Sequence, residues 1–263
     1  MNAEESPRKR TGLAEEPFEI QFPQRDRDRD DIEQDEEWCE IRLAGQRRQF
    51  RLHDYAELYA WRGLYEQLFY DELECDSPRT VCALLAEQLD SESADAADLR
   101  VLDAGAGNGM VGEQLAAMKA GSVVGVDIIQ AAAEATDRDR PDIYEDYFVL
   151  DLTDIPEDAL EDLQGRGFNC MTTVAALGFG DIPPAAFTAA FNLVEDGGHV
   201  AFNIKEDFMA HADDSGFSAL IRDALKDGTI EVARDRNYRH RLSVTGEPLN
   251  YLAVIAKKRR DLS

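Results

Sequence analysis

The chain has 263 residues, of which 44% are hydrophobic, enough for a sizeable folded core. Its formal net charge of -26 repels phosphate backbones and anionic membranes, which argues against nucleic acids and membrane surfaces as partners. No apolar run approaches the roughly 20 residues of a membrane span, and the charged N-terminus lacks the apolar core of a signal peptide. We therefore expect a cytoplasmic protein.

The cysteines and histidines give no sign of a disulfide framework or a metal site. Cys39, Cys75, Cys82 and Cys170 form no C-x-x-C pair, and the four histidines are scattered along the chain. Reduced thiols and no bound metal are the expectation.

The first 36 residues consist mainly of Glu, Asp, Arg and Pro, and the run 25–31 alternates Arg with Asp without an apolar face. This composition predicts a disordered acidic tail over 1–36. Residues 38–52 then alternate apolar and polar side chains around Ala44-Gly45-Gln46, which predicts a hairpin. A helical stretch rich in aromatics follows over 55–70. Together, residues 37–77 are expected to cover the main domain.

The main domain is expected over 78–263, opened by a helix that begins at Ser77-Pro78. Beyond Leu99 the sequence alternates between strand and helix patterns. The expected strands span 100–103, 122–127, 147–150, 168–173, 198–203, 229–234 and 251–256, and the expected helices span 110–119, 129–136, 184–193 and 217–225. This alternation predicts an α/β fold with parallel, doubly wound βαβ units and helices on both faces of the sheet.

A glycine-rich loop follows the first of these strands. Gly105, Gly107 and Gly109 allow a tight turn and a close approach of a ligand to the backbone, next to the free N–H groups of the following helix. The spacing of Gly107, Gly109 and Gly112 also fits the dinucleotide fingerprint G-x-G-x-x-G. The loop alone therefore suits either a phosphate or an amino-acid carboxylate.

Three acids at the ends of three successive strands narrow the choice of ligand. Asp103 would repel a pyrophosphate but would favour an ammonium group, such as that of S-adenosylmethionine. Asp127 can accept hydrogen bonds from ribose hydroxyls, and Asp151 can accept one from an adenine amine. Leu152 would then lie against the adenine ring.

These residues resemble the motifs of the class I S-adenosylmethionine-dependent methyltransferases. The segment 103–107 is similar to the first motif of that family, Asp127 to its ribose-binding acid, Asp151-Leu152 to its adenine-side pair, and 194–200 to its glycine turn into strand five. The resemblance implies a mostly parallel seven-stranded sheet that ends in an antiparallel C-terminal hairpin. It implies S-adenosylmethionine as cofactor, bound by Asp103, Ala104, Gly105, Ala106, Gly107, Gly109, Asp127, Ile128, Asp151, Leu152 and Thr173. Tyr59, Trp61, Tyr65 and Tyr70 resemble an aromatic cover.

The sequence gives weaker indications of the methyl acceptor than of the cofactor. Residues 172–181 lack the Asn/Asp-Pro-Pro-Tyr/Phe-type motif used on nucleobase amines, so a small-molecule acceptor is favoured. Asn203 and Lys205 lie where a strand end would meet the acceptor, and His240 is a candidate general base in a basic, aromatic segment at 238–241 that could receive an acidic acceptor. A non-catalytic cofactor-binding or interaction protein and an NAD-dependent oxidoreductase remain the alternatives.

Overall fold

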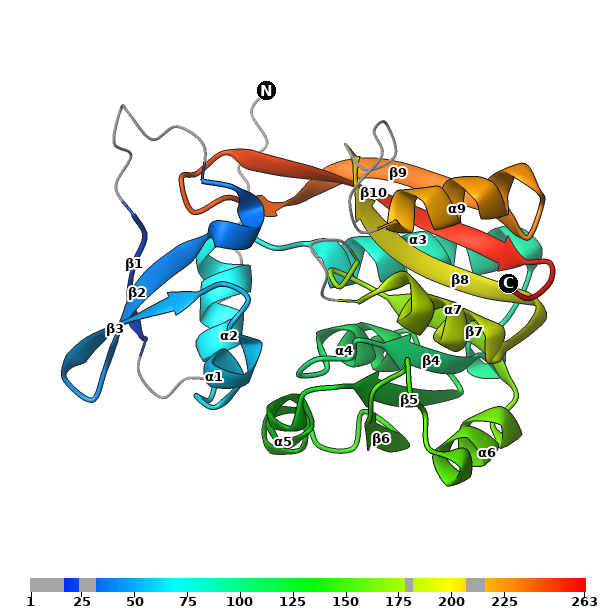
Figure 1. Cartoon of the computed structure of the whole chain (residues 1–263), viewed down its shortest axis with the longest axis horizontal. Coiled ribbons are helices and arrows are strands. Elements are labelled where there is room, and N and C mark those ends of the chain that lie inside the picture. The colour runs from blue at the N-terminus through cyan, green and yellow to red at the C-terminus, as the bar shows by residue number, and fades with distance from the viewer. Residues whose placement is uncertain (1–16, 24–31, 178–181, 207–215) are drawn as a thin grey trace.

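The computed structural model describes residues 17–23, 32–177, 182–206 and 216–263. Its main body is a seven-stranded sheet in the order β6-β5-β4-β7-β8-β10-β9 (Figure 1). The strands of this sheet are β4 (Arg100–Ala104), β5 (Ser122–Asp127), β6 (Asp146–Val149), β7 (Phe168–Thr173), β8 (Val194–Lys205), β9 (Ile230–Leu242) and β10 (Pro248–Lys258). Strands β6, β5, β4, β7 and β8 pair in parallel, and β10 pairs antiparallel with β8 and β9. The expected fold, with its antiparallel C-terminal hairpin, is confirmed.

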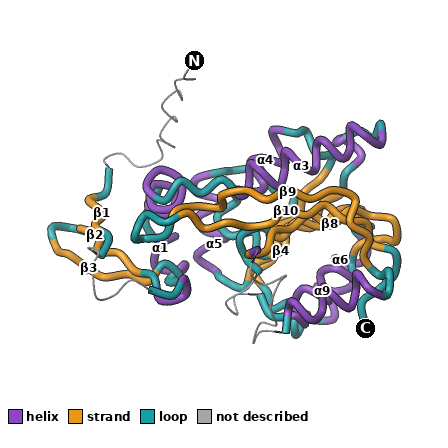
Figure 2. The backbone as a smooth tube through the Cα atoms, turned by 90° about the horizontal axis from the view of Figure 1, so that it is seen from above, coloured by secondary structure: helices purple, strands orange, loops and turns teal. Residues whose placement is uncertain are grey.

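Helices cover both faces of the sheet, as Figure 2 shows from above. The helices of the main domain are α3 (Ser77–Glu92), α4 (Met110–Ala117), α5 (Gln130–Asp139), α6 (Glu157–Gly165), α7 (Pro184–Asn192) and α9 (Phe217–Lys226). Apolar residues of α3 and α4 form one core with the sheet, and those of α6, α7 and α9 form another on the opposite face. Because both faces are buried, β7 is buried at five of its six positions. Among the described residues, no helix is both long and apolar enough to cross a bilayer.

Helix α3 begins at Ser77-Pro78 as predicted, since proline fits the first helical turn, where no N–H partner is needed. Its residues Val81, Leu84 and Leu85 are fully buried against the sheet. The helix is therefore part of the core of the main domain.

Three strands are several residues longer than the sequence indicated: β8, β9 and β10, the last of which spans Pro248–Lys258 where 251–256 was expected. Strand β8 starts at Val194 and runs through the glycine pair that was expected as a turn, because Gly197 takes a positive φ of 86° within a register shift against β7. Strand β9 continues past Arg234 to Leu242. It is an edge strand, and most of its residues from 231 to 239 are exposed, so its charged residues, which resemble a loop in the sequence, are compatible with a strand.

The N-terminal residues form a separate layer, which we call the cover and define as residues 17–23 and 32–76. It contains a three-stranded antiparallel sheet of β1 (Glu19–Gln21), β2 (Trp38–Leu43) and β3 (Gln46–Arg51). Its described helical segments are a 3₁₀ helix (Gln34–Glu36), α1 (Tyr55–Tyr59), α2 (Leu64–Glu66) and a π-helix (Gln67–Glu72) that continues α2. The predicted hairpin is present, with Ala44-Gly45 as its turn. The single helical stretch expected over 55–70 is interrupted at Gly63, which has a positive φ of 76°.

The prediction of a disordered tail over 1–36 is wrong for residues 19–21. Strand β1 pairs with β2, and Phe18, Ile20 and Phe22 pack against the apolar core of the cover. The alternation of these three side chains is a strand signal that the charged composition around them obscured. Residues 34–36 of the expected tail are also structured, because they form a short 3₁₀ helix in which Gln34 is buried. The parts of the expected tail at 1–16 and 24–31 lie outside the described residues.

Candidate functional site

The glycine loop connects β4 to α4 at the edge where the parallel strands end. Gly105, Gly107 and Gly109 have positive φ values of 73°, 55° and 87°, a region that side chains other than glycine rarely adopt. A Cβ atom on Gly107 would lie 2.7 Å from the hydroxyl oxygen of Tyr59. Glycine at 107 is therefore required both by the turn and by the close approach of the cover.

Side chains from three elements fix the backbone of Gly107. Its N–H donates to Asp127 Oδ2 at 2.8 Å. Its carbonyl accepts hydrogen bonds from the Tyr147 hydroxyl at 2.7 Å and from Thr136 Oγ1 at 3.1 Å. The loop is thus held in one shape before any ligand binds. Sequence reasoning did not find Tyr147 or Thr136, because no local pattern marks a side chain that bonds a distant backbone group.

A pocket opens above this loop, between the sheet edge and the cover, with about 1050 Å³ of empty space including the part open to solvent. We call it the first pocket. Asp127 and Asp151 are its only charged lining residues among those described, and both are acidic. Such a wall favours a ligand that carries positive charge and disfavours a pyrophosphate.

The structure brings most of the predicted cofactor residues into this wall. The lining includes Gly105, Ala106, Gly107, Asp127, Ile128, Asp151 and Leu152. Four predicted residues do not line the first pocket: Asp103, Ala104, Gly109 and Thr173. Ala104 is buried in β4, Gly109 caps α4, and Thr173 is fully buried with a hydroxyl group that has no hydrogen-bond partner among the described residues.

Asp103 lies behind the loop instead of in the pocket wall and is 1% exposed. Its carboxylate accepts hydrogen bonds from Thr172 Oγ1 at 2.6 Å and from the Tyr144 hydroxyl at 2.7 Å. Burial raises its pKa to about 6, although both hydrogen bonds act in the opposite direction. The direct contact with a ligand ammonium group expected from the sequence is therefore replaced by a supporting position beneath the loop.

The other two acids differ in their surroundings. Asp127 is half-buried, and its second oxygen accepts the N–H of Ile129 at 2.9 Å. Burial raises its pKa, opposed by these backbone hydrogen bonds. Asp151 is exposed, and hydrogen bonds from the hydroxyl and N–H of Thr153 lower its pKa. A carboxylate has about four lone-pair positions, so each acid retains capacity for a ligand donor.

Tyrosines of the cover form the upper wall of the first pocket. Tyr55, Tyr59, Tyr65 and Tyr70 line it, in agreement with most of the aromatic cover expected from the sequence. Tyr59 and Tyr65 pack with their ring centroids 4.9 Å apart. Trp61 does not line the pocket and is 37% exposed.

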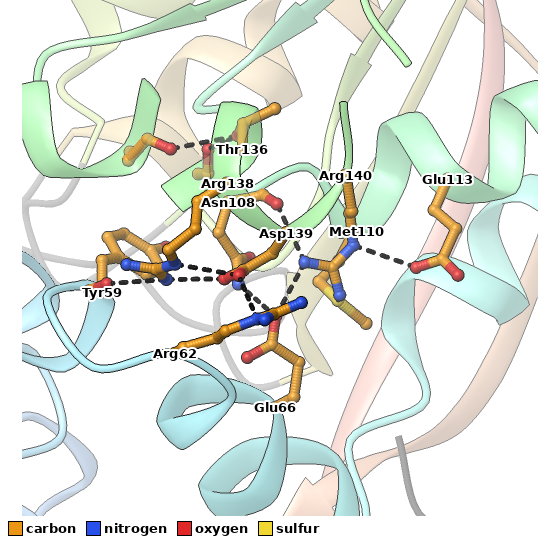
Figure 3. Close-up of polar contacts among 12 residues, drawn as sticks. Tyr59, Arg62, Glu66, Asn108, Met110, Glu113, Thr136, Arg138, Asp139 and Arg140 are labelled. Carbon is orange, nitrogen blue, oxygen red and sulfur yellow. Dashed lines mark hydrogen bonds and ion pairs between the residues drawn. The ribbon is translucent and has the colours of Figure 1, made fainter. Parts of the chain in front are cut away.

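The cover is fastened to the main domain by a buried ion pair, shown in Figure 3. Arg140, just after α5, contacts Glu66 of α2 at 2.7 Å, and the two side chains are 7% and 1% exposed. Glu66 also accepts a hydrogen bond from Asn108 Nδ2 at 2.7 Å, and Arg140 donates to the Asn108 carbonyl at 3.1 Å. Asn108 of the glycine loop is therefore hydrogen-bonded to both Glu66 and Arg140.

Neighbouring residues of α5 extend this attachment. Arg138 donates to the carbonyl of Tyr59 at 3.1 Å, and Asp139 contacts Arg62 at 3.3 Å (Figure 3). The end of α5 thus contacts α1, α2 and the segment between them. We call residues 138–140 with Glu66 and Asn108 the clamp.

The three predicted catalytic candidates have different positions. Asn203 is fully buried; it accepts the N–H of Ala175 at 2.7 Å and donates to the Tyr238 hydroxyl at 2.8 Å. Ala175 has an unusual positive φ of 57° and lines the first pocket, so Asn203 holds the pocket wall from behind. Lys205 is half-buried at the end of β8 and does not line the first pocket.

His240 is not in a solvated basic segment, because β9 carries it into the interior, where it is 5% exposed. Its Nδ1 lies 2.6 Å from Ser77 Oγ. Burial, with a smaller effect of Arg241, lowers its pKa well below the ordinary value. The ring is therefore neutral at pH 7 and accepts a proton less readily than an exposed imidazole.

The basic side chains beside His240 are already paired. Arg241 forms an ion pair with Glu37, and both side chains are almost fully buried. Arg239 pairs with Glu74 at the surface. The acidic acceptor that the sequence suggested for this segment would therefore meet two carboxylates that already hold the arginines.

The chain matches a family model described as a methyltransferase domain over residues 74–243, more than half of its length. None of the curated proteins compared with the chain matches it. Three solved structures with a similar fold are a Thermoplasma acidophilum protein, the magnesium protoporphyrin IX methyltransferase of Synechocystis with bound SAH, and an S-adenosylmethionine-dependent methyltransferase of Clostridium acetobutylicum.

The likeness to each of these structures is remote. The Thermoplasma protein is 16% identical, with 68% of this chain and 85% of that chain covered and a TM-score of 0.49. The Synechocystis enzyme is 16% identical, with 69% and 82% covered and a TM-score of 0.47. The Clostridium protein is 14% identical, with 74% and 96% covered and a TM-score of 0.48.

Proposed function

The chain belongs to the family of methyltransferase domains, with S-adenosylmethionine as cofactor, and we propose that it transfers the methyl group to a small molecule. The observation that carries the proposal is the first pocket, whose floor is the glycine loop, whose charged lining is acidic, and whose upper wall is formed by tyrosines of the cover. The family match also favours a methyltransferase over the oxidoreductase that the spacing of Gly107, Gly109 and Gly112 allowed.

The residues of the first pocket fit this cofactor. A Cβ on Gly105 would lie 2.8 Å from Ile182 Cδ1, and one on Gly107 would lie 2.7 Å from the Tyr59 hydroxyl oxygen, so glycine at both positions lets the walls of the first pocket approach the loop closely. We assign Asp127 to the ribose hydroxyls, and Asp151 with Leu152 to the adenine. Asp103 acts from beneath the loop, where its charge attracts the cationic part of the ligand without contact.

When bound, S-adenosylmethionine would supply an activated methyl group on a positively charged sulfur, and the electron pair of the C–S bond would remain on that sulfur when a lone pair of the acceptor takes the methyl group. The protein's part is to orient and enclose. The clamp holds the cover over the loop, and the tyrosines shield one side of the first pocket from solvent. Asn203 acts as a positioning residue through Ala175.

A small acceptor is supported by the enclosure and by the charge of the molecule. The cover residues Tyr55, Tyr59, Tyr65 and Tyr70 line the pocket from above and narrow the access of a large substrate. The net charge of -26 repels a polyanionic acceptor such as RNA.

Ligand-induced stabilisation tests the cofactor. With S-adenosylhomocysteine at one hundred times its dissociation constant, the free energy of unfolding rises by roughly 2.7 kcal/mol. For a protein of this size we expect the Tm to rise by about 5–10 °C in a thermal unfolding experiment. NADH at the same concentration serves as the control and is expected to leave the Tm unchanged. A shift with NADH and none with S-adenosylhomocysteine would contradict the proposal.

Replacing Asp127 by Ala tests the ribose assignment. The variant loses a charged hydrogen-bond acceptor of the first pocket and the acceptor of the Gly107 N–H, so we expect the Kd for S-adenosylhomocysteine to rise roughly 10- to 100-fold by calorimetry. Asp154→Ala removes an exposed carboxylate that does not line the pocket and should leave the Kd unchanged. Equal affinities of Asp127→Ala and the wild type would refute the assignment.

A further inference from the structure

A second pocket, distinct from the one assigned to the cofactor, lies between the cover and the C-terminal hairpin. It holds about 490 Å³ of empty space including its open part, and its lining includes Gln34 and Phe69 of the cover and His240 and Tyr251 of the hairpin. Tyr55, Tyr65 and Ala175 line both pockets. The first and second pockets therefore share a wall formed by these three residues.

The chemistry of this second pocket is that of a neutral, aromatic site. Arg241 is its only lining Asp, Glu, Lys or Arg among the described residues. Both terminal nitrogens of Arg241 are engaged, one with Glu37 and one with the carbonyl of Leu242 at 2.8 Å. A ligand carboxylate placed here would be repelled by the buried Glu37, which is 1% exposed. An uncharged ligand avoids this cost.

One buried polar group in this pocket lacks a partner. Gln34 is 8% exposed, and one end of its amide donates to the Tyr251 hydroxyl at 2.9 Å. The amide oxygen, Oε1, has no hydrogen-bond partner among the described residues. A buried amide end left unpaired costs free energy, which a ligand hydroxyl would recover, since a hydroxyl can pair with either end of an amide.

The rings around the pocket set the shape of the ligand. His240 and Tyr251 lie with ring centroids 4.2 Å apart and an interplanar angle of 34°. Tyr65 and Phe69 pack on the opposite side of the lining, with centroids 4.6 Å apart. Rings of this kind favour a flat, apolar body with aromatic character.

We propose that the second pocket binds the methyl acceptor, and that the acceptor is an uncharged aromatic compound whose hydroxyl group pairs with the free end of the Gln34 amide. The inference rests on the proposed function, because the wall shared with the first pocket is where the acceptor and the methyl group would meet. Gln34 is a specificity-determining residue in this arrangement, and Asn203 supports the shared wall through Ala175.

The test measures binding to the protein saturated with S-adenosylhomocysteine. The probes are p-cresol, a neutral phenol, and 4-hydroxybenzoate, which differs by a carboxylate in place of the methyl group. We expect p-cresol to bind by calorimetry or saturation-transfer NMR and 4-hydroxybenzoate to bind at least tenfold more weakly. Equal or tighter binding of the carboxylate, or no binding of p-cresol, would overturn the inference.

A pair of variants ties the binding to the second pocket. Gln34→Met keeps the side-chain length but removes the amide, and should weaken p-cresol binding about tenfold while leaving the Kd for S-adenosylhomocysteine unchanged. Gln49→Met, on the exposed face of β3, is the matched control and should change neither. Unchanged p-cresol affinity in Gln34→Met would overturn the role of Gln34. Failure of S-adenosylhomocysteine to bind the wild type would instead overturn the proposed function, and this inference with it.

Discussion

Replacing Arg140 by Met is expected to lower the free energy of unfolding by about 3–5 kcal/mol, because it leaves the carboxylate of Glu66 buried without its cation. The hydrogen bond that Asn108 Nδ2 donates to this carboxylate would remain, but it does not compensate the charge. Urea unfolding of the wild type and the variant measures the difference. Since the same pair holds the cover over the glycine loop, we also expect weaker binding of S-adenosylhomocysteine.

Two further variants distinguish the cost of an unpaired buried charge from the cost of losing an ion-pair contact. Adding Glu66→Gln to Arg140→Met removes the unpaired charge and should recover part of the lost stability. Arg100→Met breaks an exposed pair with Glu195 and a hydrogen bond to the Gly167 carbonyl, and is expected to cost about 1 kcal/mol. If Arg140→Met is no more destabilising than Arg100→Met, the clamp does not hold the cover.

Replacing Asp103 by Asn is expected to change how stability depends on pH. In the folded chain the pKa of Asp103 is raised to about 6, whereas an unfolded chain releases this proton near pH 4. Between these values the native state binds more protons, so the free energy of unfolding of the wild type falls as the pH rises from about 4 to 6. The Asn side chain does not titrate, so the free energy of unfolding of the variant does not show this part of the decrease.

The measurement is urea unfolding of both proteins between pH 4 and pH 7. The stability of Asp103→Asn relative to the wild type should rise by up to about 3 kcal/mol across this range. Asp196→Asn, at an exposed position near the start of β8, provides the control for general charge effects and should show no such rise. A constant difference between Asp103→Asn and the wild type would mean that Asp103 titrates like an exposed acid.

The alternating part of the fold could be predicted from the sequence because local patterns specify it. Strands β5 and β7 have the bounds that their apolar runs indicated, and α3 begins at its proline. Segments whose structure depends on distant partners were missed. Strand β1 needs β2, and the outer half of β9 needs β10 on one side and the Glu87 side chain for Arg236. Neither partner is visible in a local window.

For the candidate site, too, the sequence predicted the local motifs but not the contacts between distant residues. The glycines and the strand-end acids directly follow strands that the local sequence pattern predicts, and most of them line the first pocket. The position of Asp103 beneath the loop follows from Tyr144 and Thr172, which lie 41 and 69 residues away along the chain. The clamp joins residues 74 apart, and a buried pair of this kind has no sequence signature.

The ion pair between Glu37 and Arg241 has a consequence for the order in which the molecule can assemble. Its partners are 204 residues apart, and the bond from Gln34 to Tyr251 spans 217. During synthesis the glycine loop and its acids therefore emerge from the ribosome long before the hairpin that closes the second pocket. The residues of the glycine loop are therefore available for folding early, whereas the second pocket forms only after Arg241 and Tyr251 have also emerged.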